Sequence, residues 1–293
     1  MSHELDAEEL ERQAQSFLKG LSAHLVSLAG TAVPIDALGN AAGPEQFFSY
    51  TGFVISYRGL WIYVTAGHVF QQLHNQICQN QIRLVHCHLS DNFGPDAASC
   101  LSFPFDFINA KKFVIDNEGE GVDIGLMGIT PLYRAAMESK RVLPFVMDGW
   151  DNPVSVEFSD YAVLGLPAEH IDQTRRVTVV GEKVIGGVRI AVLFGSRSDA
   201  VPRTKPQPRR PWFAIELRDK DQLRSVIGMS GGPMLAFHTR EGRRPLYTVV
   251  GIQSWWDSER RICFGTPIAT VMELLEAACE FALRERETTD RTS

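Results

Sequence analysis

The stretch Ile227-Gly228-Met229-Ser230-Gly231-Gly232-Pro233 places one serine among three glycines. An oxyanion forming on an acyl carbon is stabilised by two backbone N–H groups, and only a backbone without Cβ crowding bends sharply enough to bring both close to a substrate carbonyl. Here Gly228 and Ser230 would supply the two N–H groups, and the Ser230 hydroxyl would be the nucleophile. A glycine-rich β-turn that holds an ordinary serine has the same sequence, so the rest of the chain must distinguish the two interpretations.

Earlier in the chain, a histidine and an aspartate are suited to activate the Ser230 hydroxyl. His68 follows the apolar run Leu60–Thr65, and we expect its ring to be held at the end of a buried strand. Asp123 opens a short apolar stretch, from which its carboxylate could accept a hydrogen bond from His68 Nδ1, fix the tautomer and stabilise the imidazolium. A structural histidine and a turn aspartate are the alternatives at these two positions.

The order His68, Asp123, Ser230 separates folds that use the same three residue types. Residues 228–232 also fit the G-x-S-x-G turn of α/β-hydrolases, but those enzymes place the acid and the histidine after the serine. Only His238 follows Ser230 here, without an intervening strand–helix unit. Subtilisin-type enzymes start with the aspartate, so their order does not fit either.

The composition excludes several classes of protein. A chain of 293 residues has room for one large β domain or two small barrels. Its 29 basic and 35 acidic residues give a net charge of −6, which offers no general attraction to nucleic acid or to an anionic membrane. No apolar run reaches the roughly 18 residues of a membrane span, so we expect neither nucleic acid nor a membrane as a partner.

The cysteines and histidines predict no disulfide framework and no metal site. Five cysteines are an odd number without framework spacing, and the acidic N-terminus lacks the features of a signal peptide, so reduced thiols in a cytoplasmic location are expected. In a strand over residues 81–89, His86 and His88 would face away from Cys87. Neither a metal nor another cofactor is therefore expected.

The chain begins with a helical pattern and continues as short strands. Apolar residues recur at helical spacing over residues 5–28, and an Ala-, Gly- and Pro-rich linker is expected over residues 30–44. The helix either packs on the outside of the domain or docks a regulatory protein partner. Residues 130–152 are expected to cross between two halves, and the basic loop 196–211 is either a solvated loop or a site of partner binding or autocleavage.

Five short motifs carry a resemblance to one protease family. In chain order they are Thr65-Ala-Gly-His68, Asp123-Ile-Gly-Leu126, Gly228-Met-Ser-Gly-Gly-Pro233, Val250-Gly-Ile-Gln-Ser254-Trp255 and Gly265-Thr-Pro-Ile268. They resemble the T-A-[AG]-H, D-I-A-L, G-x-S-G-G-P, substrate-pairing and closing segments of trypsin-like (chymotrypsin-fold) serine proteases. Within that family, the chain most resembles the bacterial intracellular or HtrA-type members. The resemblance covers about residues 46–285.

The resemblance implies an all-β fold of two six-stranded antiparallel β-barrels with a helix at each end. The first barrel, over residues 46–140, would carry His68 and Asp123, and the second, over 141–286 with its C-terminal helix, would carry Ser230. Residues 1–45 would be the N-terminal helix and linker, and 287–293 a disordered tail. The implied activity is a serine endopeptidase that cleaves protein or peptide substrates through a triad and an acyl-enzyme.

The resemblance also implies a substrate-binding region. Ser254 resembles the serine that hydrogen-bonds the catalytic aspartate, and the backbone from Ser254 through Trp255 to Trp256 would pair with an extended substrate. Arg224 occupies the position at the base of the specificity pocket, so a preference for Lys or Arg lacks a supporting carboxylate, and an acidic P1 residue is the alternative.

Two departures from the family pattern suggest regulation and narrow specificity. Met229 stands where the zymogens have an aspartate, so activation by N-terminal cleavage is not expected. Trp256 stands where a small residue is usual and would narrow the pocket or gate it. A catalytically inactive or occluded protein-binding module with the same fold is therefore the alternative to a regulated peptidase.

Overall fold

A computed structural model describes most of the chain. The described residues are 7–91, 102–147, 158, 160–169, 177–180, 183–186, 190–203, 207–218, 225–238, 246–277 and 280. Within these ranges, no helix combines the length and the apolar character needed to cross a membrane.

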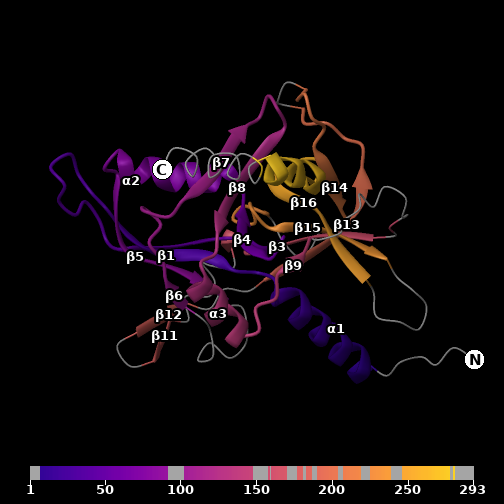
Figure 1. Cartoon of the computed structure of the whole chain (residues 1–293), viewed down its shortest axis with the longest axis horizontal. Coiled ribbons are helices and arrows are strands. Elements are labelled where there is room, and N and C mark those ends of the chain that lie inside the picture. The colour runs from indigo at the N-terminus through magenta and orange to yellow at the C-terminus, as the bar shows by residue number, and fades with distance from the viewer. Residues whose placement is uncertain are drawn as a thin grey trace, which may run out of the picture.

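The second half of the chain forms a closed six-stranded antiparallel barrel (Figure 1). Around the barrel the strands run β10 (Asp160–Gly165), β13 (Ala191–Ser198), β14 (Phe213–Leu217), β17 (Ile262–Pro267), β16 (Leu246–Asp257) and β15 (Pro233–His238). β16 is long enough to pair with both β15 and β17, and its register with β17 shifts between Gln253 and Trp255. One of the two expected barrels is thus present, and a bulge lies at Ser254.

The first half consists of two sheets. A five-stranded sheet has the order β7 (Lys112–Asn117), β8 (Val122–Gly128), β4 (Leu60–Thr65), β3 (Phe53–Tyr57) and β9 (Phe145–Val146), and a four-stranded sheet has the order β2 (Gln46–Tyr50), β1 (Ser27–Pro34), β5 (Ile82–Ser90) and β6 (Ser102–Pro104). The sheets meet where Leu25 bridges Phe53 and the Val26 N–H donates to Gly52 O. β9 pairs with β3 in parallel, a departure from the expected antiparallel pattern. Closure of this half into a second barrel remains a prediction.

Strand β1 occupies part of the expected linker. It lies between β2 and β5 in the four-stranded sheet, so the linker expectation for residues 30–34 is wrong. Its small residues allow close strand contact, because a Cβ at Gly30 would overlap the His86 carbonyl. The same small residues produce the composition of a linker, which is why the sequence pattern was misleading.

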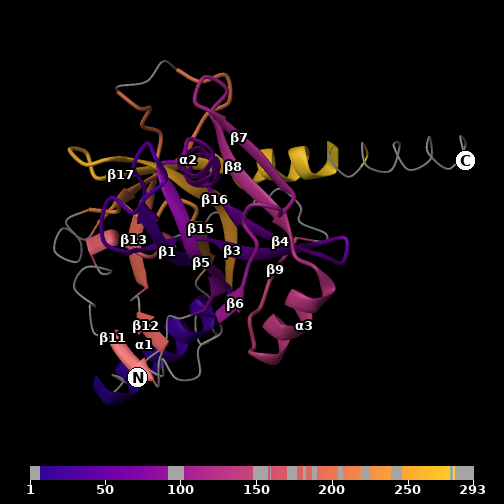
Figure 2. The same cartoon turned by 90° about the vertical axis from the view of Figure 1, so that its left-hand side faces the viewer.

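The structure also contains smaller elements. Helices α1 (Ala7–Ser22), α2 (Gly67–Cys78) and α3 (Pro131–Ser139) accompany the sheets, residues 268–277 are helical, and β11 (Val177–Val180) pairs with β12 (Lys183–Gly186). The first half of α2 buries Val69, Phe70 and Leu73. Short strands had been predicted after the N-terminal helix, so α2, over residues 67–78, was not predicted. Figure 2 shows α1 and the helix over residues 268–277 at opposite ends of the fold.

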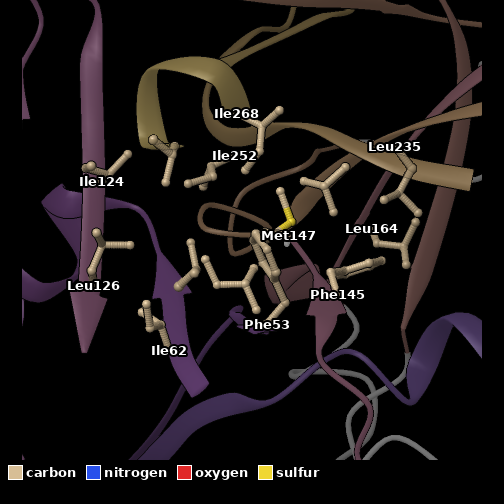
Figure 3. Packing of buried hydrophobic residues seen from close by; sticks show 14 of the residues in the cluster. Phe53, Ile62, Ile124, Leu126, Phe145, Met147, Leu164, Leu235, Ile252 and Ile268 are labelled. Atoms are coloured by element: carbon tan, nitrogen blue, oxygen red, sulfur yellow. The ribbon is translucent and has the colours of Figure 1, made fainter. Parts of the chain in front are cut away.

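One apolar cluster joins the two halves. It takes Phe53, Ile62 and Ile124 from the first half and Leu164, Leu235 and Ile252 from the barrel. Figure 3 shows Phe145 and Met147, from the segment that crosses between the halves, lying among these side chains. Because both halves share one core, their relative position is fixed by close packing.

Helix α1 reaches the same cluster through its last turn. Leu21 of that turn is buried in it, as is Leu25 just after the helix, and the Phe17 ring lies 5.7 Å from that of Phe237 on β15. The helix therefore packs on the core between the halves. Docking of a partner on its exposed face remains a prediction.

Candidate active site

His68 lies in the first turn of a helix that follows a buried strand. β4 ends at Thr65, Ala66 has extended backbone angles (φ −73°, ψ 145°), and α2 begins at Gly67. We had expected His68 at the end of the strand itself. This expectation is wrong, because Ala66 separates β4 from the helix that carries His68. Gly67 permits the turn, because a Cβ there would overlap Ile115 O and lie 2.8 Å from Ile124 O.

Asp123 holds His68 through both carboxylate oxygens. Oδ2 lies 2.6 Å from His68 Nδ1, and Oδ1 accepts the backbone N–H of the same histidine at 2.8 Å. An ionised carboxylate only accepts hydrogen bonds, so Nδ1 carries the proton and Nε2 presents its lone pair. Asp123 is 4% exposed, so water competes little for these contacts. The pair has the geometry of a base and its orienting acid.

The barrel supports the aspartate from behind. The Asp123 N–H donates to Oγ1 of Thr266, a buried residue of β17, at 2.9 Å. Ser254 Oγ lies 3.4 Å from Asp123 O and 3.2 Å from Ile252 O. Ser254 was expected to hydrogen-bond the catalytic aspartate; its partner there is the main-chain carbonyl, not the carboxylate. Thr266 had no role assigned from the sequence beyond its place in the closing motif. A single hydroxyl in an otherwise apolar strand was the feature that could have indicated its contact with Asp123.

Two glycines with positive φ shape the turn that carries Ser230. Gly228 has φ +91° and Gly231 has φ +90°, a region that side chains with a Cβ rarely adopt. The Met229 N–H donates to Val226 O at 3.0 Å, and the Gly232 N–H donates to Met229 O at 2.9 Å. The Met229 side chain is fully buried in the barrel core, so the residue before the serine anchors the turn by apolar packing.

The serine turn lies directly against the segment that leads to His68. A Cβ at Gly231 would overlap Thr65 Oγ1 and lie 2.5 Å from Thr51 O and 2.8 Å from Ala66 N. On its other side, the Gly231 N–H donates to Gln253 O at 2.7 Å, and the Gln253 N–H donates to Gly232 O at 2.9 Å. The structure therefore brings the turn of Ser230 together with the His68–Asp123 pair at the boundary between the two halves.

The two peptide groups that flank Gly228 are both held by hydrogen bonds. Ile227 O accepts the Ala168 N–H at 2.7 Å, and Gly228 O accepts the Thr51 hydroxyl at 2.8 Å. In a trans peptide the N–H points opposite to the C=O, so the Gly228 N–H is directed away from Ala168. A donor with a fixed direction is what stabilisation of an oxyanion requires. Thr51 did not appear among the candidate residues from sequence.

The expected substrate-binding residues lie on β16 where the structure describes them. Pairing of β16 with β15 ends at Ile252, whereas Trp255 and Trp256 still pair with Phe264 and Cys263 of β17. Among the described strands, this stretch therefore pairs with β17 alone. Arg224 lies outside the described residues.

The two tryptophans differ in their surroundings. The Trp255 ring packs 5.1 Å from that of Phe264. The half-buried Trp256 side chain packs against the barrel cluster that also contains Val226 and Met229, and its Nε1 is buried without a hydrogen-bond partner in the described part of the chain. Trp256 thus packs against the same apolar cluster that buries Met229.

Searches for relatives by sequence give no family, and the similar solved structures are distant. No family model and no curated protein matches the sequence. The structure of Deg5 is similar at 18% identity over 92% of this chain and 95% of that chain, with a TM-score of 0.47. A thermostable serine protease, AL20, from an extremophilic microorganism is similar at 12% identity over 84% of this chain and 91% of that chain, with a TM-score of 0.43. The protease Anisep from Arthrobacter nicotinovorans is similar at 13% identity over 84% and 90%, with a TM-score of 0.46. Such distant similarities do not establish a family for this chain.

Proposed function

We propose that the chain is a serine endopeptidase with Ser230 as nucleophile, His68 as general base and Asp123 as the residue that orients the base. The observation that carries the proposal is the paired contact of the Asp123 carboxylate with His68, at 2.6 Å to Nδ1 and 2.8 Å to the backbone nitrogen. With Nδ1 donating to Asp123, the neutral ring carries its lone pair on Nε2, which would accept the proton of Ser230. The motif order given by the sequence supports the same roles.

The proposed reaction proceeds in two acyl-transfer steps. Ser230 Oγ bonds to the peptide carbonyl carbon while its proton passes to His68 Nε2, and the oxyanion is stabilised by the N–H groups of Gly228 and Ser230. The C–N bond then breaks, and the amine leaves with the proton from His68. A water molecule then gives one proton to His68 and bonds to the acyl carbon, the bond from that carbon to Ser230 Oγ breaks, His68 returns the proton to Oγ, and the carboxylic acid product leaves.

The proposed substrate is an extended protein or peptide segment. The backbone of residues 254–256 would pair with the substrate, and Trp256 would restrict the side chain that precedes the scissile bond. Trp256 packs against the barrel cluster that also contains Met229, the residue before Ser230, and we expect its bulk to favour a small P1 side chain. This restriction supports a peptidase of narrow specificity.

The test is labelling of Ser230 by a fluorophosphonate probe. Ser230 Oγ would bond to phosphorus, fluoride would leave, and the proton would pass to His68. We expect the wild-type protein to be labelled and Ser230→Ala to remain unlabelled, with the labelled peptide identified by mass spectrometry. A wild-type protein that stays unlabelled while folded contradicts the proposal and favours the occluded binding module.

A second control separates loss of the nucleophile from loss of the fold. The Ser230 side chain is half-buried in a turn held by the neighbouring backbone, so Ser230→Ala should keep the wild-type melting temperature. Equal labelling of wild type and Ser230→Ala would place the reactive group elsewhere.

A further inference from the structure

The Thr51 hydroxyl connects the two halves of the fold at the serine turn. Its hydroxyl donates to Gly228 O at 2.8 Å and accepts the Leu166 N–H at 2.9 Å. Its carbonyl accepts the Thr65 hydroxyl at 2.7 Å. Thr51 is 1% exposed and lies in the first half, whereas Gly228 and Leu166 belong to the second.

The geometry of these bonds leaves the hydroxyl one orientation. A threonine hydroxyl has a single proton, and here that proton must point at Gly228 O because the Leu166 N–H can only donate. The Thr51 Oγ1 atom therefore spaces Leu166 and Gly228 at a fixed separation. Water has no access to replace it, because the residue is buried.

Thr51 and the barrel half together hold the peptide planes at Gly228. The 227–228 peptide is held by Ala168 through Ile227 O, and the 228–229 peptide is held by Thr51 through Gly228 O and by Val226 through the Met229 N–H. Two fixed planes determine both backbone angles of the glycine between them, and the observed φ is +91°. Of these three bonds only the one from Thr51 comes from the first half, and glycine has no Cβ to restrict rotation when that bond is lost.

We infer that Thr51 is a positioning residue for the proposed peptidase: its hydroxyl holds the Gly228–Met229 peptide and thereby helps to fix the backbone angles at Gly228, whose N–H belongs to the adjoining peptide and would face the oxyanion. The inference rests on the proposed function. It also links the two halves to the reaction, since the same residue receives the hydrogen bond from Thr65, three residues before His68. The His68 segment and the serine turn are thus both bonded to Thr51, the first through its main-chain carbonyl and the second through its hydroxyl.

The test compares rates of fluorophosphonate labelling for three variants of Thr51. The phosphoryl oxygen of the probe occupies the oxyanion position, so its rate reports the donor directly. Removal of one oxyanion donor lowers catalysis by about 10²–10³-fold, and a donor that is present but free to rotate should lower it less. We therefore expect Thr51→Val to label roughly 10- to 100-fold more slowly, and Thr51→Ser, which keeps the hydroxyl, to label within about threefold of wild type.

Two readouts distinguish positioning from a purely structural role. The midpoint pH of the labelling profile should stay at its wild-type value while the plateau rate falls, because Thr51 does not contact the His68–Asp123 pair. Thr31→Val is the matched control, since the Thr31 hydroxyl is buried and has no hydrogen-bond partner in the described part of the chain. It should label at the wild-type rate.

Each outcome bears on the inference. If Thr51→Val does not fold, Thr51→Ala replaces it, because alanine removes the hydroxyl without placing a methyl group against Gly228 O and the Leu166 N–H. A folded Thr51→Val or Thr51→Ala that labels at the wild-type rate overturns the role of Thr51 and leaves the peptidase proposal standing. A loss that Thr51→Ser fails to restore also overturns it. Absence of labelling in the wild type contradicts the peptidase proposal, and the inference about Thr51 with it.

Discussion

Replacement of Asp123 by asparagine should move the ring proton of His68 from Nδ1 to Nε2. The carboxylate accepts two hydrogen bonds from that histidine, one from the backbone N–H at 2.8 Å and one from Nδ1 at 2.6 Å. An asparagine has one acceptor oxygen and one NH2 group. The backbone N–H cannot become an acceptor, so the amide oxygen must face it and the NH2 group must face Nδ1. Nδ1 then accepts, Nε2 carries the proton, and His68 can no longer take a proton from Ser230.

The magnitude follows from the cost of the other amide orientation. Turning the NH2 group toward the His68 backbone leaves a buried N–H unsatisfied, which costs about 1–3 kcal/mol. At about 1.4 kcal/mol per factor of ten, the productive tautomer is reduced about 5- to 150-fold. Loss of the negative charge that stabilises the imidazolium adds to this, and the corresponding change in serine proteases lowers kcat by about 10⁴-fold. We expect a fall between about 10²- and 10⁴-fold.

The assay is the second-order rate of fluorophosphonate labelling at a fixed pH, with the melting temperature measured in parallel. Asp116→Asn is the control, because Asp116 is directly opposite Asp123 on the neighbouring strand β7 and is exposed. It removes the same charge nearby and should label at the wild-type rate. A folded Asp123→Asn that labels within tenfold of wild type would refute the assignment of Asp123 as the orienting acid.

Two other substitutions test how the site and the fold are held. Gly231→Ala should lower the free energy of unfolding by at least about 2 kcal/mol and abolish labelling, since the new Cβ meets Thr51 O at 2.5 Å and φ is +90°. Gly59→Ala, at φ +75° with open space around it, isolates the backbone strain and should keep full labelling. For His24, burial lowers the pKa although the hydrogen bond with Leu143 O opposes this, so the fold favours the neutral ring. Its contribution is complete above a pH of about 6.5 and is lost as the pH falls below that value, with a slope of at most about 1.4 kcal/mol per pH unit. Urea unfolding at several pH values should show this slope, and His24→Phe should reduce it; an unchanged slope would contradict the assignment.

Much of the strand pattern and the proposed triad could be predicted from the sequence because they depend on local features. The strands over residues 53–57, 60–65, 246–257 and 262–267 follow from short apolar runs between turn residues. The glycines beside Ser230 indicate a sharp turn, and the turn is present with positive φ at Gly228 and Gly231. Asp123 and His68 were paired on chemistry and chain order, and the structure places them in contact.

The errors arose where long-range contacts override local composition. β1 has the small residues of a linker, but they are needed because β2 and β5 approach it from both sides. α2 was missed because several of its residues, such as His68, Val69 and Asn75, have only modest helix propensity, so that burial of its apolar face decides its conformation.

The sequence by itself determined the kinds of chemical group available and their order along the chain, because glycines, apolar runs and the three reactive side chains are properties of short segments. Only the tertiary structure decided how these segments are aligned. The bond from Thr51 to Gly228 joins residues 177 positions apart, and that from Thr266 to Asp123 joins residues 143 apart. Such contacts form only after the two halves share a core, so no local pattern records them.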